Sequence, residues 1–333
     1  MSTQNIISII VPVYNNEKFL EEALASIQEQ DLESVEVVII NDGSTDQSSK
    51  IIEAFKDSKQ SIKTLHTKNM GVSEARNLGI GASSGEFICF MDGDDRMHSG
   101  AIAEFKRIIS QRSPDIIIGG ATQFSDTSAT SSLRRQTRNT EVLNISDFDE
   151  VSRDYVHGNY DHANWNKCFR TSIVKANDVK FISGLPKSED MIFNWHFWSH
   201  ARTVQFTEHH IIHYRIHGAS ATRTHDSTAT FLSCLSAIHK TQDIFDSKTF
   251  LHAVQYMQRK LWFEIFDEFT FSNHTPQSFL KKCHSDLPAL FTTRAEYPSI
   301  NRRNFIVDKI PGLLTVLAAI LWLHHKLKET SDP

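Results

Sequence analysis

The sequence predicts an α/β protein with a mostly parallel central sheet. Short runs of β-branched residues alternate with amphipathic helical patterns through the first third of the chain, and this alternation is typical of βαβ units. Several of these runs end in polar residues, as strands that carry a ligand site do. The chain has 333 residues, 40% of them hydrophobic, which is enough for one large domain or two smaller ones.

The expected elements follow in order along the first third. IISIIVPV (6–13) predicts a strand, and 16–30 place apolar side chains on one helical face, with Asn15 or Asn16 able to cap the helix. A strand at 35–42 leads into NDGSTDQSS, which signals the start of a second helix. The remaining elements are strand 62–67, helix 71–83, strand 86–91 and strand 115–120.

The pattern changes after Gly120. A stretch rich in Ser and Thr, 122–142, predicts a long loop, and the chain divides there. The next region, to about residue 224, contains a Trp-bearing segment, a helix at 188–201, and strands at 203–208 and 210–217. From 225 to 333 the aromatic-rich stretches predict helices.

Composition excludes some partners and compartments. The net charge of −5 leaves no basic stripe, so no nucleic-acid partner is expected. Four widely spaced cysteines fit a reducing compartment, and the N-terminus lacks the basic region of a signal peptide, which together predict a cytoplasmic protein.

The chain's last apolar run is too short to cross a bilayer. Residues 310–323 fall below the ~20 residues that a membrane span needs. A helix over 310–328 either lies on the inner face of the cytoplasmic membrane, which its Trp, His and Lys residues suit, or docks on the protein or a second copy of it.

Carboxylates follow the strand at 86–91. Asp92 and Asp94 are two residues apart at a strand end, so their side chains point to the same side. Two like charges this close favour a divalent cation such as Mg²⁺ or Mn²⁺, and such ions usually also hold substrate phosphates. The alternative is a solvated acidic turn, and Asp95 has no assigned role.

Histidines at 209, 213 and 217 would align on a helix and suggest zinc, but the alternating isoleucines around them favour a strand.

Four blocks in order resemble the family 2 glycosyltransferases of the GT-A fold. They are SIIVPVYNNEKFLEEALASIQEQ, EVVIINDGSTDQS, KNMGVSEARNLGIGASSGEFICFMDGDD and SEDMIFNW. The resemblance is strong over 5–120 and looser to about 222. It implies a nucleotide-sugar-binding half at 1–120, an acceptor-binding half at 121–224 and a helical C-terminal region at 225–333.

The resemblance also implies roles for individual residues. Pro12, Tyr14, Asp42, Arg76 and Asp92 would bind the nucleotide of a UDP-sugar donor, with Asp42 accepting the N3 hydrogen of uracil. For Asp42 the alternative is an Asx-turn, and for Arg76 a surface ion pair along its helix.

The metal, the base and the acceptor are assigned in the same way. Asp92, Asp94 and His217 would hold Mn²⁺ or Mg²⁺, although His217 equally suits a loop anchor. Asp190 would be the general base and Glu189 its support, although both also suit a helix N-terminus. Trp165 either lines the acceptor site or packs in the core.

The implied function is inverting, metal-dependent transfer of a sugar from UDP to a saccharide or lipid-linked acceptor, in the synthesis of a capsule, lipopolysaccharide or exopolysaccharide. A catalytically degenerate nucleotide-sugar-binding scaffold is the alternative. A nucleotidyltransferase and a dinucleotide-dependent dehydrogenase are rejected, because VPVYNNEKF, and not a glycine-rich loop, follows the first strand.

Overall fold

The computed structural model describes residues 6–56, 62–125, 128–134, 142–144, 162–185 and 189–218. All of them belong to one compact unit of the chain. The expected C-terminal region at 225–333, including the segment 310–328, lies outside the described residues. Within the described ranges, no helix has the length and apolar character of a membrane span.

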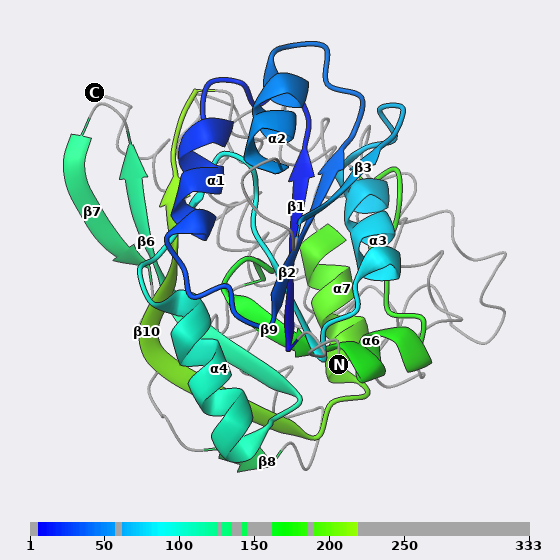
Figure 1. The fold of residues 1–333 in the computed structure, drawn as a ribbon. Helices are drawn as coiled ribbons and strands as arrows, with labels where there is room; N and C mark the ends of the chain where they lie inside the picture. The colour runs from blue at the N-terminus through cyan, green and yellow to red at the C-terminus, as the bar shows by residue number, and fades with distance from the viewer. Residues whose placement is uncertain are drawn as a thin grey trace, which may run out of the picture. The chain divides into compact units, whose positions relative to one another are not determined.

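One sheet organises the described chain (Figure 1). Its main path runs in the order β3-β2-β1-β4-β9-β6-β10-β5, with β7 pairing to β6 and β8 to β10. The strands are β1 Ile7–Val13, β2 Val35–Asn41, β3 Ile62–His66, β4 Phe87–Phe90, β5 Arg96–Met97, β6 Ile116–Ser125, β7 Ser128–Arg134, β8 Val142–Asn144, β9 Lys167–Arg170 and β10 Thr203–Arg215.

The predicted parallel arrangement is confirmed for the first four strands. β1 pairs in parallel with β2 and with β4, and β2 pairs in parallel with β3. The register aligns Val13 with Asn41 and Ile10 with Phe90, so the three strands end at the same edge of the sheet. β9 enters antiparallel between β4 and β6, an insertion that the sequence patterns do not predict.

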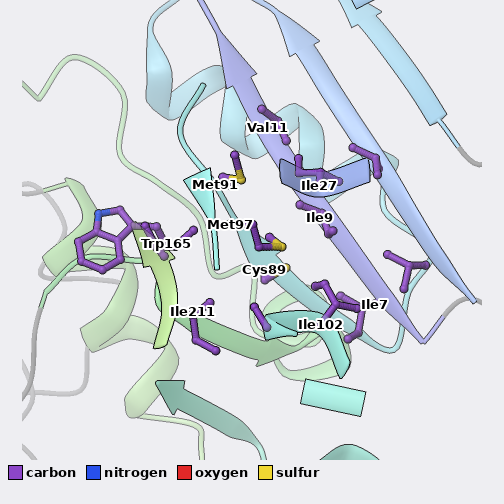
Figure 2. Close-up of a cluster of buried hydrophobic side chains, with 14 of the residues drawn as sticks. Ile7, Ile9, Val11, Ile27, Cys89, Met91, Met97, Ile102, Trp165 and Ile211 are labelled. Atoms are coloured by element: carbon purple, nitrogen blue, oxygen red, sulfur yellow. The ribbon is translucent and has the colours of Figure 1, made fainter. Parts of the chain in front are cut away.

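Helices cover both faces of the sheet. Successive side chains of a strand point to opposite faces, and on both faces these side chains are buried. Odd-numbered residues of β1 pack with α1, α2 and α4, whereas Ile10 packs with α3, α6 and α7. Figure 2 shows the first cluster, with Ile7, Ile9 and Val11 in line along β1. The helices are α1 Leu20–Gln28, α2 Ser48–Lys56, α3 Val72–Ala82, α4 Ala101–Arg112, α6 Thr171–Ala176 and α7 Glu189–Trp198.

The prediction of a loop over residues 122–142 is wrong for its first part, which forms strands. β6 continues to Ser125, and β7 returns antiparallel to it, with Ala121 opposite Arg134 (Figure 1). Ser and Thr side chains are tolerated in a strand at the sheet margin, where the polar composition alone resembles that of a loop.

Two smaller expectations also need correction. The strands predicted at 203–208 and 210–217 are one strand, β10, whose pairing with β6 shifts register between Phe206 and Ile212. Neither Asn15 nor Asn16 caps α1 with its side chain, because Phe19 occupies the cap position without a side-chain hydrogen bond. The Asn16 carbonyl instead accepts from the N–H groups of Phe19 and Leu20.

Candidate functional site

The loops after β1 and β2 are tied together by side chains. Asn15, whose φ is +50°, accepts hydrogen bonds at Oδ1 from the N–H (2.8 Å) and hydroxyl (3.3 Å) of Thr45. The Glu17 N–H donates to Asp46 Oδ2 and Glu17 Oε2 accepts from the Gln47 N–H, both at 2.9 Å. These reciprocal bonds fix the two loops against each other before any ligand arrives.

Asp42 directly follows β2 and supports the loop that leads into α3. Its Oδ1 accepts from the Thr67 hydroxyl (2.7 Å) and the Met70 N–H (2.9 Å), and its Oδ2 accepts from the Gly71 N–H (2.8 Å). The start of α2 is instead served by Asp46, so the alternative of Asp42 as the turn residue that opens this helix is wrong. Asp42 is only 2% exposed, and its contact with uracil stays a prediction.

Pro12 and Tyr14 lie where β1 meets the acidic turn of residues 92–95. Pro12 is buried in the strand, whereas Tyr14 is 46% exposed and can present its ring to a ligand. A Cβ on Gly93 would lie 2.7 Å from Asn16 Nδ2 and 3.4 Å from the Pro12 carbonyl oxygen. The acidic turn therefore packs directly on the loop after β1, which brings these predicted residues to one place.

Two glycines set the position of α3. Gly71 has φ +91°, a conformation that favours glycine, at the point where the chain turns into the helix. A Cβ on Gly79 would lie 2.4 Å from Ile10 Cγ2, so only glycine allows the helix to approach the sheet this closely. This close approach places Arg76, on the same helix, within hydrogen-bond distance of Asp92 in the acidic turn after β4.

The guanidinium of Arg76 binds three carboxylates. It donates to Asp92 Oδ1 (2.8 Å), Glu189 Oε1 (3.1 Å) and Asp190 Oδ1 (2.9 Å), and the residue is 4% exposed. Burial opposes its charge, but the surrounding carboxylates raise the pKa of Arg76 further above its usual range. Arg76 thus joins α3, α7 and the acidic turn, and it is not the surface ion pair considered as an alternative.

Glu189 and Asp190 occupy the first turn of α7, a helix whose next eight residues are all buried. Burial, together with the charges of Glu189 and Asp92, raises the pKa of Asp190 to about 7, against the opposing effect of Arg76 and Lys167. A carboxyl with a pKa near neutrality can take a proton from an alcohol during reaction and release it afterwards.

In the acidic turn, Asp94 lies beside His217. The imidazole Nε2 is 2.9 Å from Asp94 Oδ2, and both side chains are partly exposed. Burial and the neighbouring charge of Asp92 raise the pKa of Asp94. The structure therefore brings together Asp94 and His217, two of the residues implied in metal binding, although they are separated by 123 positions in the sequence.

Asp95, which the sequence left without a role, fixes the end of β10. Its Oδ1 accepts from the Arg215 N–H at 2.8 Å, and Arg215 Nε donates to the Asp94 carbonyl oxygen, also at 2.8 Å. Arg215 is 3% exposed and its guanidinium also binds Glu22. Asp95 and Arg215 together hold the strand that delivers His217, so they act on the site through another residue.

The residues of the turn fit a divalent ion as an incomplete ligand set. The side chains of Asp92 and Asp94 are 30% and 28% exposed and carry like charges. Asp92 pairs with buried Arg76, whereas Asp94 pairs with His217, which is partly exposed. Buried Asp95 Oδ2 has no hydrogen-bond partner within the described ranges, and burial, together with the charges of Asp92 and Asp94, raises the pKa of Asp95. Across those same ranges, no three His, Cys, Asp or Glu side chains converge as a metal site, so oxygen ligands from a bound molecule would have to complete it.

The histidines at 209 and 213 and the predicted acceptor residue Trp165 have contacts of their own, away from Arg76. The strand predicted for residues 210–217 is confirmed over its main part, so the histidines do not align on a helix: His213 contacts the Thr122 hydroxyl (2.6 Å) and His209 the Ser99 carbonyl (3.0 Å). Trp165 is 5% exposed and stacks on Tyr214 with ring centroids 5.5 Å apart. Figure 2 places it at the margin of the first core cluster, which favours packing over acceptor contact.

Asn164 and Arg215 reach the site without having been predicted. Asn164 Nδ2 donates to Asp190 Oδ1 at 3.1 Å from the segment that precedes β9. NWNKCFR offers two asparagines and gives no period that distinguishes the one facing the site. Arg215 and His217 are two positions apart, so an extended segment through both would place them on the same face, and this spacing could have linked the two.

The chain belongs to a known family. Its fold is that of the GT-A α/β proteins, and the sequence model described as Glycosyl transferase family 2 matches residues 8–180. The chain is a member of glycosyl transferase family 2.

Relatives extend this finding. EpsH of Bacillus subtilis (strain 168), named as a glycosyltransferase, is 30% identical over 220 residues, which cover 64% of this chain and 62% of EpsH. The poly(ribitol-phosphate) beta-N-acetylglucosaminyltransferase TarS of Staphylococcus aureus (strain Mu50 / ATCC 700699) is 27% identical over 59% of this chain and 33% of TarS. The chain thus spans less than two thirds of the length of either relative.

Solved structures share the fold. A crystal structure of S. aureus TarS 1-349 in complex with UDP-GlcNAc has a TM-score of 0.61 and 21% identity, covering 80% of this chain and 73% of that one. A mannosyltransferase from Pyrobaculum calidifontis in complex with GDP-Man and Mn²⁺ has a TM-score of 0.50 and 13% identity, covering 94% and 88%.

Proposed function

We propose that the protein is an inverting glycosyltransferase that moves a sugar from a UDP-sugar to a hydroxyl of a saccharide or lipid-linked acceptor. The observation that carries the proposal is the convergence on Arg76 of Asp92, from the donor side, and Glu189 and Asp190, from the first turn of α7. Family membership supports the reaction class.

The proposed transfer is a single displacement. The acceptor hydroxyl oxygen forms a bond to the anomeric carbon, the bond from that carbon to the β-phosphate oxygen breaks, and UDP leaves. The hydroxyl proton passes to Asp190, whose pKa of about 7 suits a base at neutral pH. Attack from the face opposite to UDP inverts the anomeric configuration.

Asp92, Asp94 and His217 would hold Mn²⁺ or Mg²⁺ with the diphosphate. A bound divalent ion neutralises the charge that develops on the leaving UDP, so no protonated acid is needed. The partly exposed carboxylates and the contact of Asp94 with His217 support this assignment.

UDP is the proposed nucleotide. Asp42, Pro12 and exposed Tyr14 line up at the ends of β1 and β2, and the TarS structure that shares the fold contains UDP-GlcNAc. The name of TarS, which acts on a poly(ribitol-phosphate), supports an acceptor that belongs to a cell-surface polymer. We further propose a cytoplasmic enzyme, with peripheral membrane contact or self-association through the C-terminal region.

A panel of nucleotide sugars tests the proposal. The full chain is incubated with UDP-, GDP- and dTDP-sugars and Mn²⁺, with and without candidate acceptors, and nucleotide release is measured. We expect release from a UDP-sugar, its loss with EDTA, and its loss in Asp94→Ala. Tight UDP binding without release under any condition would favour the scaffold alternative, and release from GDP-sugars alone would contradict the assignment of UDP.

A further inference from the structure

The carboxylate of Asp190 has one oxygen engaged and one oxygen free of protein donors. Oδ1 accepts from Arg76 (2.9 Å) and from Asn164 Nδ2 (3.1 Å). Within the described parts of the chain, Oδ2 accepts no hydrogen bond from the protein, and the side chain is 22% exposed. Two donors on one oxygen stabilise negative charge there and leave the other oxygen for an incoming proton.

The amide of Asn164 is itself fixed by a second amide. Asn194 Nδ2 lies 2.5 Å from Asn164 Oδ1 and 2.8 Å from each of two backbone carbonyl oxygens, those of Asp190 and His162. Asn164 is 1% exposed and Asn194 is completely buried. An ionised carboxylate only accepts hydrogen bonds, so Asn164 must direct its NH₂ group to Asp190 and its oxygen to Asn194.

These contacts close a ring of hydrogen bonds around the first turn of α7. The ring runs from the Asp190 carboxylate to Asn164, from Asn164 to Asn194, and from Asn194 back to the Asp190 carbonyl, one helical turn away. The side-chain torsions of Asp190 are thereby coupled to the helix and to the segment before β9. A base held in this way keeps its free oxygen in one direction.

We infer that Asn164 and Asn194 are positioning residues for the transfer reaction: they hold Asp190 by Oδ1 so that Oδ2 faces the acceptor hydroxyl. The inference rests on the proposed function, because it assigns the amides to the base of that reaction. Neither amide touches the substrate in this scheme.

The decisive variant is Asn164→Asp, which keeps the shape and removes the donor. It sets a second carboxyl against Oδ1, so the pair must share a proton. We expect kcat to fall about tenfold or more, the donor KM to stay within about threefold, and the acid limb of the pH profile to move to higher pH. Asn194→Ala should move the same quantities in the same direction by a smaller amount, because it acts through Asn164.

Asn77→Ala is the matched control. Its amide also makes two hydrogen bonds, both to the backbone of Phe181 and neither to a carboxylate. We expect kcat and the acid limb of this variant to match those of wild type. UDP binding by calorimetry and the circular dichroism spectrum report folding for every variant.

The outcomes separate the two proposals. If Asp190→Asn retains transfer, the assignment of the base in the proposed function fails. If Asp190→Asn is inactive while folded Asn164→Asp and Asn194→Ala keep the wild-type kcat and acid limb, the positioning role is overturned and the proposed function stands. A parallel loss of activity in Asn77→Ala would also overturn the positioning role, because an amide that bonds no carboxylate would then have the same effect.

Discussion

At the residue scale, a single buried guanidinium organises charges from distant parts of the chain. Arg76 binds Asp92, which lies 16 positions away, and Asp190, which lies 114 positions away. Its planar fork can serve several carboxylates at once, which an ammonium group cannot do in the same geometry. The site therefore depends on the shape of this side chain as well as on its charge.

Replacement of this fork tests that dependence. We expect Arg76→Lys to lower the free energy of unfolding by about 2–4 kcal/mol, because carboxylates lose buried partners. The control is Arg107→Lys, which alters the ion pair between half-exposed Arg107 and Glu104 and should change stability by less than about 0.5 kcal/mol. Urea denaturation measures both, and equal effects in the two variants would contradict the role given to Arg76.

Asp190→Asn separates binding from chemistry. The amide keeps the size of the side chain and removes the proton acceptor, so transfer should fall by about 100-fold or more. The affinity for UDP should change little, because the nucleotide contacts proposed for Asp42 and Tyr14 lie on other loops. Turnover assays and calorimetry measure the two quantities, and wild-type turnover would exclude Asp190 as the base.

The raised pKa of Asp190 predicts the direction of the pH dependence. A general base acts when it is deprotonated, so kcat/KM should be high above about pH 7 and fall as the pH decreases through that value. The slope should approach a tenfold loss per pH unit on the acid side. A profile that stays flat from pH 8 to about pH 5 would mean that the essential carboxyl has an ordinary pKa near 4.

At the element scale, the contact between α3 and the sheet sets the position of Arg76. Gly79→Ala would introduce a Cβ that lies 2.4 Å from Ile10 Cγ2 and 2.9 Å from Ile40 Cδ1. We expect it to destabilise the fold by about 1–3 kcal/mol through overpacking, and to lower transfer by displacing the guanidinium.

The same helix supplies a control for this prediction. Gly81→Ala adds the same methyl group where no heavy atom lies within 4 Å, so it should stabilise the helix by about 0.5–1 kcal/mol. Thermal unfolding of the two variants distinguishes packing from helix propensity. A stabilising Gly79→Ala would contradict the close approach of α3.

The elements that the sequence predicted well are those with local signals. β1, β2 and β4 are rich in apolar residues, and the helices around them have clear periodicity, so their presence follows from neighbouring residues. β3, with the sequence IKTLH, has a weaker apolar pattern. β7 was missed because its Ser- and Thr-rich pattern matches a loop, and its pairing with β6 depends on tertiary context. The antiparallel entry of β9 has no local signal at all.

The residues of the candidate site also fall into two groups: those that stand in local motifs and those whose role depends on distant contacts. Asp92, Asp94, Glu189 and Asp190 stand in recognisable motifs, and three of these four meet at Arg76. The contribution of Asp95 could not be predicted, because it depends on a backbone N–H of Arg215, 120 positions away. Long-range hydrogen bonds of this kind have no signature in a single sequence.

At the scale of the whole molecule, the proposed chemistry lies between residues 12 and 217, while the apolar segment at 310–323 lies outside the described residues. We expect that removing the residues after Lys309 abolishes co-sedimentation with anionic vesicles and leaves UDP affinity unchanged, because the proposed nucleotide contacts are far upstream in the sequence. Unchanged sedimentation of the truncated chain would show that the segment packs on protein.

The contact between Asp94 and His217 also has a consequence during synthesis. The two residues are 123 positions apart, and at about 5–20 residues per second a ribosome needs roughly 6–25 seconds to pass from one to the other. During that interval the acidic turn has emerged without β10, Arg215 or His217. A nascent chain therefore exposes the acidic turn before β10 is complete, and the proposed metal ligands Asp94 and His217 can meet only after β10 docks.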